Sequence, residues 1–278
     1  MTEHNYRKYS FADCKDNKEL KKCQIIHELY KQQRMNINYV KNQDLLDKCT
    51  TQYKTISNFW SVFSLLDNII DLSDPDTSLP NSIHALQTAE AIRNSNKKYP
   101  DWMHLIGLIH DLGKIIYING CDDDGTSRTT QWSIVGDTFI TGCALPDTLV
   151  LPEYNKYNAD HTDHMDIYNM GCGLRNCSVS FGHDEYLYHL LIANNHKMPE
   201  EAEYIIRYHS LYAWHSSDAY DYLEDSTDKK MKTIVKEFSS FDLYSKNDNL
   251  PIKWTPDLKY YYSELVKKYI NPSLLIRW

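Results

Sequence analysis

One apolar segment, "LIGLIHDLGKII" at residues 105–116, carries charged groups in the middle of what reads as a buried helix. His110 and Asp111 are adjacent, and Lys114 follows Asp111 by about one helical turn. An isolated carboxylate in an apolar interior is costly unless it is paired or coordinates a metal ion. Either specific partners elsewhere in the chain satisfy these charges, or the segment is not a buried helix.

The chain has 278 residues, of which 42% are hydrophobic and 24% charged, as in ordinary globular proteins. The net charge of −8 argues against a nucleic-acid surface, which normally shows a basic stripe. We find no apolar N-terminal stretch typical of a signal peptide, and no run near the roughly 18 apolar residues that span a membrane. Seven scattered cysteines fit reduced thiols. We therefore expect a cytoplasmic protein that binds neither nucleic acid nor membranes.

Apolar periodicity predicts a mainly α fold. We expect helices within residues 50–72, 80–95, 101–113, 183–195, 199–214, 228–241 and 256–270. Asn81 and Ser82 are cap-type residues at the start of the second of these helices. Residues 117–177 are rich in Asp, Gly, Thr and Asn and predict long loops, with short extended pieces around "SIVGDTFITG" and a mobile "CDDDGTSRTT". The expectation is one compact helical bundle over 1–278, with core helices at about 42–116 and 183–270 and a loop-rich insertion.

Further histidines and a carboxylate can serve as partners for His110 and Asp111. His84 precedes His110 by 26 residues, and His183 precedes His209 by the same interval. The equal spacing fits two helix pairs of similar length that face one another, and coincidence is the alternative. Asp242 lies in "EFSSFDLYSK", an aromatic setting where a lone carboxylate is unexpected. Four histidines and two aspartates on packed helices predict a two-metal centre. Nitrogen and oxygen ligands without thiolate favour iron, manganese or a similar ion.

Other histidines and cysteines have simpler interpretations. A lone helical histidine is more often a hydrogen-bonded core or surface residue than a ligand. His161 and His164 in "DHTDHMD" have helical ligand spacing, but their acidic, loop-rich surroundings favour a solvated patch. Cys172 and Cys177 in "CGLRNC" resemble half of a zinc site, yet no second cysteine pair accompanies them. A structural role is favoured for the cysteines.

Six ordered motifs resemble the myo-inositol oxygenase family, the redox branch of the HD-domain superfamily. They are "SDPDTSLPNSIHALQTAEAIR", "DWMHLIGLIHDLGK", "WSIVGDTF", "GHDEYLY", "IRYHSLYAWH" and "FDLYSK". The resemblance runs over nearly the whole chain. It implies a single HD-domain-like helical fold that acts as a monomer and encloses two iron ions in a mixed-valent Fe(II)/Fe(III) state. The implied reaction is oxidation of myo-inositol by O2 to D-glucuronate, with substrate chelated to one iron and O2 activated at the other.

The resemblance also implies roles for individual residues. One iron takes His84, His110 and Asp111, and the other takes Asp111 as a bridge together with His183, His209 and Asp242. Asp111 and Lys114 are the implied catalytic residues. The implied substrate contacts are Arg7, Asp71, Leu72, Ser73, Lys114, Gly136, Asp137, His209, Ser210 and Lys246.

Several of these positions carry alternatives. Lys114 also suits a solvated helix end, where its charge complements the helix dipole. Asp71 and Asp137 also suit caps or turns. Leu72 stands where the family usually has a carboxylate, so only its backbone is expected to take part. The insertion at 119–130 is longer than in the family and could alter a lid over the site.

Two other functions compete with the oxygenase. A metal-dependent phosphohydrolase of the HD-domain superfamily would release phosphate without consuming O2, but few basic residues accompany the motifs. A non-catalytic binding protein would keep only the helical shell, and the intact set of ligands disfavours it.

Overall fold

A computed structural model describes residues 10–50, 53–74, 80–163, 166–245 and 252–278. Arg7 and Lys246 lie outside these ranges. The helices are α1 (Asn17–Asn36), α2 (Tyr39–Thr50), α3 (Phe59–Phe63), α4 (Asn81–Arg93), α5 (Asp101–Ile109), α6 (Ala159–Asp163), α7 (His183–Ala193), α8 (Glu200–Tyr208), α9 (Tyr212–His215), α10 (Ser226–Ser245) and α11 (Pro256–Tyr269). Short 3-10 segments are η1 (Phe11–Asp13), η2 (Ser64–Asn68), η3 (Leu112–Asn119), η4 (Pro152–Tyr157) and η5 (Leu174–Asn176). The mainly α fold is confirmed.

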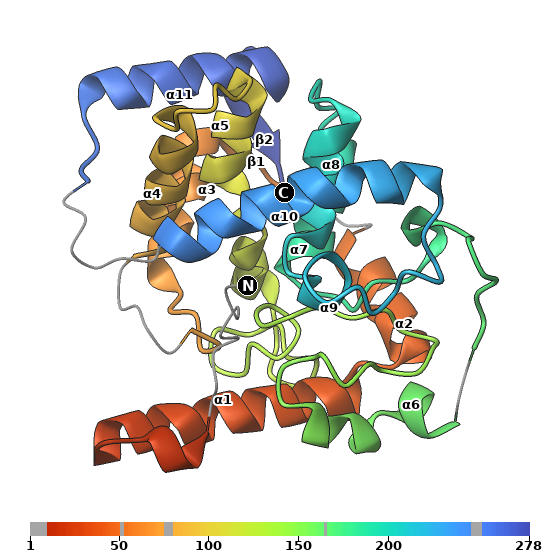
Figure 1. Ribbon diagram of the computed structural model, residues 1–278. Helices are drawn as coiled ribbons and strands as arrows, with labels where there is room; N and C mark the ends of the chain where they lie inside the picture. Colours follow the sequence, from red (N-terminus) through yellow and green to blue (C-terminus); the bar gives the residue numbers. More distant parts are fainter. Residues whose placement is uncertain (1–9, 51–52, 75–79, 164–165, 246–251) are drawn as a thin grey trace.

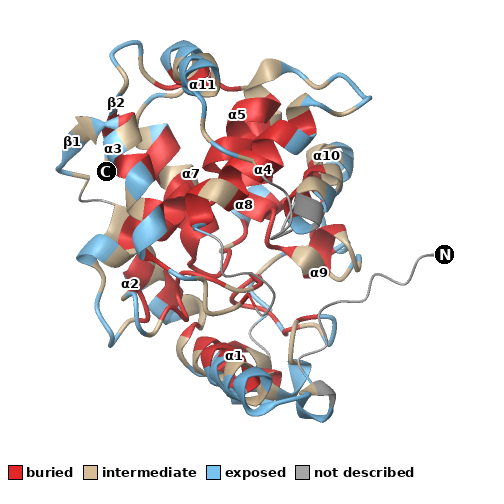
Figure 2. Cartoon of the chain, turned by 90° about the vertical axis from the view of Figure 1, so that its left-hand side faces the viewer, coloured by how far each residue is buried: buried red, intermediate tan, exposed pale blue. Residues whose placement is uncertain are grey.

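Helices α4, α5, α7 and α8 lie at the centre and form the core. Helix α10 crosses in front of them, α1 lies along the lower edge and α11 along the upper edge (Figure 1). Buried residues concentrate in α4, α5, α7 and α8, whereas α1 buries only one side (Figure 2). None of the helices in the described ranges is long and apolar enough to cross a membrane.

The expected helix at 50–72 is wrong as one element. It divides into strand β1 (Ile56–Asn58), α3 and η2. Strand β1 pairs antiparallel with β2 (Leu275–Arg277) near the end of the chain. Asn58 then begins a new helix, because its side chain accepts a hydrogen bond from the Trp60 N–H.

Other helix limits also differ from the expectation. Helix α5 ends at Ile109, so His110 and Asp111 lie at the junction with η3. The expected helix at 199–214 divides into α8 and α9. Asn81 and Ser82 lie inside α4, whose N-cap is Pro80, so neither is the cap. Helix α1 was not among the expected elements, and α2 begins slightly before the core helices expected from about residue 42.

The loop-rich segment at 117–177 is present as expected and lies between α1 and the central helices (Figure 1). Its extended part forms one isolated bridge, Ile140 to Val179. The buried guanidinium of Arg34 on α1 holds this segment by an ion pair with Asp137 and by packing over the Phe139 ring. Within 121–130, Asp122 and Asp124 accept hydrogen bonds from nearby Ser and Thr hydroxyls. Its mobility stays a prediction.

Helices α4 and α5 approach closely at Gly107. A Cβ atom there would lie 2.7 Å from Ala89 Cα and 2.9 Å from Ala89 N. These are backbone atoms and cannot move aside without shifting α4. The contact matters for the site because His84 lies on α4 and His110 follows α5.

We expect Gly107→Ala to lower the free energy of unfolding by about 1–3 kcal/mol, because overpacking forces the two helices apart. Urea denaturation measures the change. Gly182→Ala is the matched control, since a Cβ there meets its nearest atom at 3.6 Å and the backbone is extended. Equal effects of the two substitutions would contradict the proposed tight contact.

Candidate metal centre

Four buried histidines and two buried aspartates gather in the middle of the helical core. His84 lies on α4 and Asp242 on α10, while His183 is the first residue of α7. His110 and His209 directly follow the C-terminal ends of α5 and α8. The structure thus brings together all six positions that the resemblance marked as metal ligands.

Five of the six side chains form two groups that share Asp111. Ligand atoms of His84, His110 and Asp111 lie within 4.8 Å of one another, and so do those of Asp111, His183 and His209. Asp111 Oδ2 lies 3.8 Å from His84 Nε2 and 3.6 Å from His110 Nε2. Asp111 Oδ1 lies 3.3 Å from His183 Nε2. Each oxygen of one carboxylate therefore faces a different histidine pair.

Asp242 lies beside the first histidine pair. Its Oδ1 is 2.9 Å from His84 Nε2 and 3.2 Å from His110 Nε2. The resemblance had implied that Asp242 belongs with His183 and His209, and these distances favour the other group. The reason is the course of α10, which packs against α4 as well as α8.

Backbone carbonyls orient three of the imidazoles. The Nδ1 atoms of His110, His183 and His209 lie 2.9, 2.6 and 3.0 Å from the carbonyl oxygens of Gly107, Ile134 and Ile206. A carbonyl only accepts, so each Nδ1 donates and a neutral ring presents its Nε2 lone pair to the centre. His110 Nε2 has no hydrogen-bond partner among the described residues. Imidazole nitrogens and carboxylate oxygens that converge in this way fit a site for metal cations.

Lys114 is buried beside this centre, so the solvated helix-end interpretation is wrong. Its Nζ lies 2.8 Å from Asp71 Oδ2, 3.0 Å from Asp111 Oδ2 and 3.4 Å from Asn81 Oδ1. Burial acts to raise the pKa of Asp111, but the Lys114 ammonium and the imidazoles outweigh it and hold this pKa well below its usual range. Asn81 was missed by sequence reasoning. Its amide nitrogen donates to the carbonyls of residues 66 and 69, which turns its oxygen toward Lys114.

The segment at 71–73 forms a turn next to Lys114. Asp71 Oδ1 accepts hydrogen bonds from the Ser73 backbone N–H at 2.8 Å and from its hydroxyl at 2.6 Å. The Leu72 N–H donates to the side chain of Gln131, another residue that sequence reasoning missed. Asp71 therefore stabilises a turn through one oxygen and contacts Lys114 through the other.

The carboxylate of Asp137 stabilises the loop-rich segment. It accepts from Arg34 Nη2 at 3.2 Å and from the Val150 N–H at 2.9 Å. Burial raises the pKa of Asp137 against the opposing effect of Arg34. Gly136 has φ of +99° and faces the Tyr30 ring, so this position favours glycine. Ser210 is buried, and its carbonyl accepts from the Thr138 N–H.

Comparison with known proteins identifies the family. A family model described as Myo-inositol oxygenase matches residues 23–278. The chain belongs to the myo-inositol oxygenase family. An inositol oxygenase of Dictyostelium discoideum is 43% identical over 224 residues, which cover 77% of this chain and 73% of that protein. Inositol oxygenases of Sus scrofa and Arabidopsis thaliana (inositol oxygenase 1) are 41% and 39% identical, covering 74% and 83% of this chain and 71% and 75% of those proteins.

The solvated patch expected at His161 and His164 stays a prediction. His161 Nδ1 accepts from the Leu145 N–H, and His164 lies outside the described residues. His215 is buried and donates through Nε2 to the His209 carbonyl, and burial lowers its pKa to about 4. The sulfurs of Cys172 and Cys177 lie 3.6 Å apart, and no metal-ligating set in the described part of the chain includes them.

A buried ion pair joins α7 to α8 close to His183 and His209. Arg207 binds both carboxylate oxygens of Glu185, with its Nε at 2.7 Å and its Nη2 at 2.8 Å. Glu185 lies two residues after His183, and Arg207 lies two residues before His209. Burial acts to raise the pKa of Glu185, and Arg207 more than offsets it, so this pKa is lowered. The pair therefore sets how the two helix ends meet.

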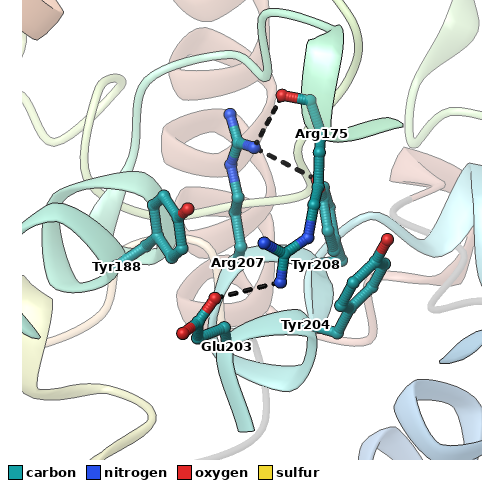
Figure 3. Close-up of a pocket in the computed structure, with 6 residues that line it drawn as sticks. All are labelled: Arg175, Tyr188, Glu203, Tyr204, Arg207 and Tyr208. Atoms are coloured by element: carbon teal, nitrogen blue, oxygen red, sulfur yellow. Dashed lines mark hydrogen bonds and ion pairs between the residues drawn. The ribbon is translucent and has the colours of Figure 1, made fainter. Parts of the chain in front are cut away.

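Arg207 of this ion pair also lines a pocket (Figure 3). Its lining residues are Arg175, Tyr188, Glu203, Tyr204, Arg207 and Tyr208. Arg175 and Glu203 form a second, more exposed ion pair there at 2.9 Å. The pocket thus holds the exposed salt bridge, while Glu185, the carboxylate of the buried one, is not among its lining residues.

We expect Glu185→Gln to lower the free energy of unfolding by about 3–5 kcal/mol, because it leaves the Arg207 charge buried and uncompensated. Glu203→Gln breaks the exposed pair and is expected to cost about 1 kcal/mol or less. Chemical denaturation of both variants measures the difference. Similar small losses would show that the buried pair does not hold α7 against α8.

Proposed function

We propose that this chain binds two iron ions at the six clustered side chains and oxidises myo-inositol with O2 to D-glucuronate. Family membership and the names of the relatives support the reaction. One observation supports the metal assignment most directly. The two carboxylate oxygens of Asp111 face different histidines, with Oδ1 near His183 and Oδ2 near His84 and His110. A carboxylate placed in this way fits a bridge between two ions about 3.5–4 Å apart.

The donor set favours iron over softer metals, because imidazole nitrogens and carboxylate oxygens surround the site without thiolates. When bound, two iron ions in a mixed-valent state would supply chelation of neighbouring hydroxyl oxygens, a lowered pKa for one hydroxyl, and electron transfer with O2. His84, His110 and Asp242 would hold one ion, His183 and His209 the other, and Asp111 both. Overall, one oxygen atom of O2 enters the acid and the other leaves as water.

Lys114 would provide the charged donor for the polyol. Its ammonium has three hydrogens and is held by Asp71, Asp111 and Asn81. A substrate hydroxyl near Asp111 could accept from this ammonium, and its burial excludes competing water. The other proposed contacts are Arg7, Asp71, Leu72 through its backbone, Ser73, Gly136, Asp137, His209, Ser210 and Lys246.

We further propose that residues 1–278 form a single HD-domain-like unit that acts as a monomer in the cytoplasm. The continuous family match over residues 23–278 and the shared helical core support one unit.

The test is anaerobic loading of the full chain with Fe(II), followed by measurement of O2 uptake with and without myo-inositol and assay of glucuronate. We expect uptake that depends on inositol and yields glucuronate, and its loss in Asp111→Asn, which weakens the bridge. Bound iron without O2 uptake, together with phosphate release from nucleotides or sugar phosphates, would overturn the proposal and favour the phosphohydrolase.

We expect Lys114→Met to lower kcat/KM for myo-inositol by about 10- to 100-fold, because a hydrogen bond to a charged group is lost. Its iron content should stay at two ions per chain, since Lys114 is no ligand. Lys48→Met, which removes an exposed lysine paired with Asp124, is the matched control and should leave kcat/KM unchanged. Full activity of the Lys114 variant would exclude the proposed contact.

A further inference from the structure

Gln131, which directly follows the insertion at 119–130, is a buried residue whose side-chain amide is fully paired. Its Nε2 donates to the carbonyl oxygens of Ile70 and Arg128, each at 2.8 Å, and its Oε1 accepts from the Leu72 N–H at 3.2 Å. Both hydrogens of the amide are therefore used. Exchanging the places of Nε2 and Oε1 would break all three hydrogen bonds, so the amide has one orientation.

The bonds to Ile70 and Leu72 hold the two peptide groups that flank Asp71. The Ile70 carbonyl belongs to the peptide group before Asp71, and the Leu72 N–H belongs to the one after it. Because peptide groups are planar, fixing both of them fixes the backbone dihedral angles of Asp71 and the direction in which its side chain leaves the backbone. That side chain reaches Lys114, whose Nζ lies 2.8 Å from Asp71 Oδ2.

The backbone of Gln131 has φ of +51°, in a region that favours glycine. Such a conformation persists only where the surrounding contacts fix it. Here the Gln131 N–H donates to the Ser127 carbonyl, and the Gln131 carbonyl accepts from the N–H groups of Ile134 and Val135. None of these backbone bonds requires a glutamine, and a glycine would adopt the conformation with less strain. The three bonds of the amide are therefore the physical reason for a glutamine at this position.

The backbone and the side chain of Gln131 act on different parts of the site. Through its backbone, Gln131 holds Ile134, whose carbonyl accepts from the N–H of His183 at 2.9 Å and from its Nδ1 at 2.6 Å. Through its amide, Gln131 holds Asp71 and hence Lys114. A substitution that removes only the side chain therefore leaves the contacts of His183 in place and tests the second connection alone.

We propose that Gln131 is a positioning residue for polyol recognition: its amide fixes Asp71, and Asp71 directs the Lys114 ammonium. This rests on the proposed function, because it assumes that Lys114 donates to a substrate hydroxyl. A lysine side chain is a flexible stem, so the direction of its charge depends on its acceptors. Lys114 also donates to Asp111 Oδ2 at 3.0 Å. When Asp71 shifts, the ammonium moves toward Asp111 and away from the position where it would meet the polyol.

The first experiment measures substrate binding without turnover. Full-length wild type, Gln131→Gly and Asn195→Gly are loaded anaerobically with Fe(II), iron per chain is counted, and the Kd of labelled myo-inositol is measured by equilibrium dialysis. Asn195 is the matched control, because it is exposed, has φ of +50° and lies beyond the end of α7 opposite His183. We expect Gln131→Gly to keep the wild-type iron content and to raise Kd about 10-fold or more, and Asn195→Gly to change neither.

The second measurement separates a positioning residue from a structural one. The values of kcat/KM from inositol-dependent O2 uptake are compared for wild type, Gln131→Gly, Asp71→Ala and the double variant. If Gln131 acts through Asp71, its substitution has nothing left to displace once the Asp71 carboxylate is absent. We therefore expect less than about a twofold further loss in the double variant. A structural residue would reduce kcat/KM by the same factor in both backgrounds.

Gln131→Met replaces the glycine variant in both measurements where Gln131→Gly does not fold. It keeps the approximate volume of the side chain but removes the two donors and the amide oxygen. The same rise in Kd is expected, because the peptide groups on both sides of Asp71 lose their partner.

Three results would overturn the proposal: an unchanged Kd in a folded Gln131 variant, an equal loss of kcat/KM with and without Asp71, or loss of folding in both Gln131 variants. These outcomes differ from failure of the proposed function. Wild type that binds and oxidises myo-inositol while a Gln131 variant does so equally refutes the role of Gln131 alone. Wild type that neither binds myo-inositol nor takes up O2 with it refutes the proposed function itself.

Discussion

The carboxylate of Asp111 is the contact on which the rest of the site depends. It is buried, faces a histidine pair with each oxygen, and receives the Lys114 ammonium on Oδ2. A charge in such surroundings is stable only when its partners are fixed in place. Three features of the structure fix these partners: the helix ends, the hydrogen bonds from imidazoles to backbone carbonyls, and the turn at 71–73.

Two helix pairs supply these partners in the same way. In α4–α5 and in α7–α8, the first histidine lies near the start of the first helix and the second follows the end of the returning helix. This explains the equal spacing of 26 residues from His84 to His110 and from His183 to His209. Gly107 keeps the first pair close, and the Glu185–Arg207 ion pair joins the second. Different contacts thus produce the same hairpin geometry.

Sequence reasoning reached the parts of the structure that depend on local pattern. Local apolar pattern is enough to locate α4, α7, α10 and α11. Helices α10 and α11 bury one stripe of residues, whereas α4 and α7 are buried over most of their length. The pattern failed at 56–58, where strand formation depends on pairing with residues 275–277 at the far end of the chain. It also missed α1, whose buried side chains include Arg34 and Gln33, polar residues that normally mark an exposed face.

The same limit applies to the site. The motifs indicated the six clustered side chains. They did not indicate which histidine pair Asp242 lies beside, because that depends on how α10 packs against α4 and α8. Asn81 resembled a helix cap and instead orients Lys114 through an amide held by two carbonyls. Sequence reasoning also missed Asp184, which is buried beside His183 and His209. The one available signal was the sequence "HDE", which repeats the His-Asp order of His110–Asp111.

The two groups share one carboxylate, and they do not share it equally. Oδ2 of Asp111 faces the first group and also accepts from Lys114 at 3.0 Å, whereas Oδ1 faces the second group. A carboxylate oxygen that accepts a charged hydrogen bond donates less electron density to a metal. On the proposed function, Lys114 would therefore distinguish the two metal positions electronically as well as bind the polyol.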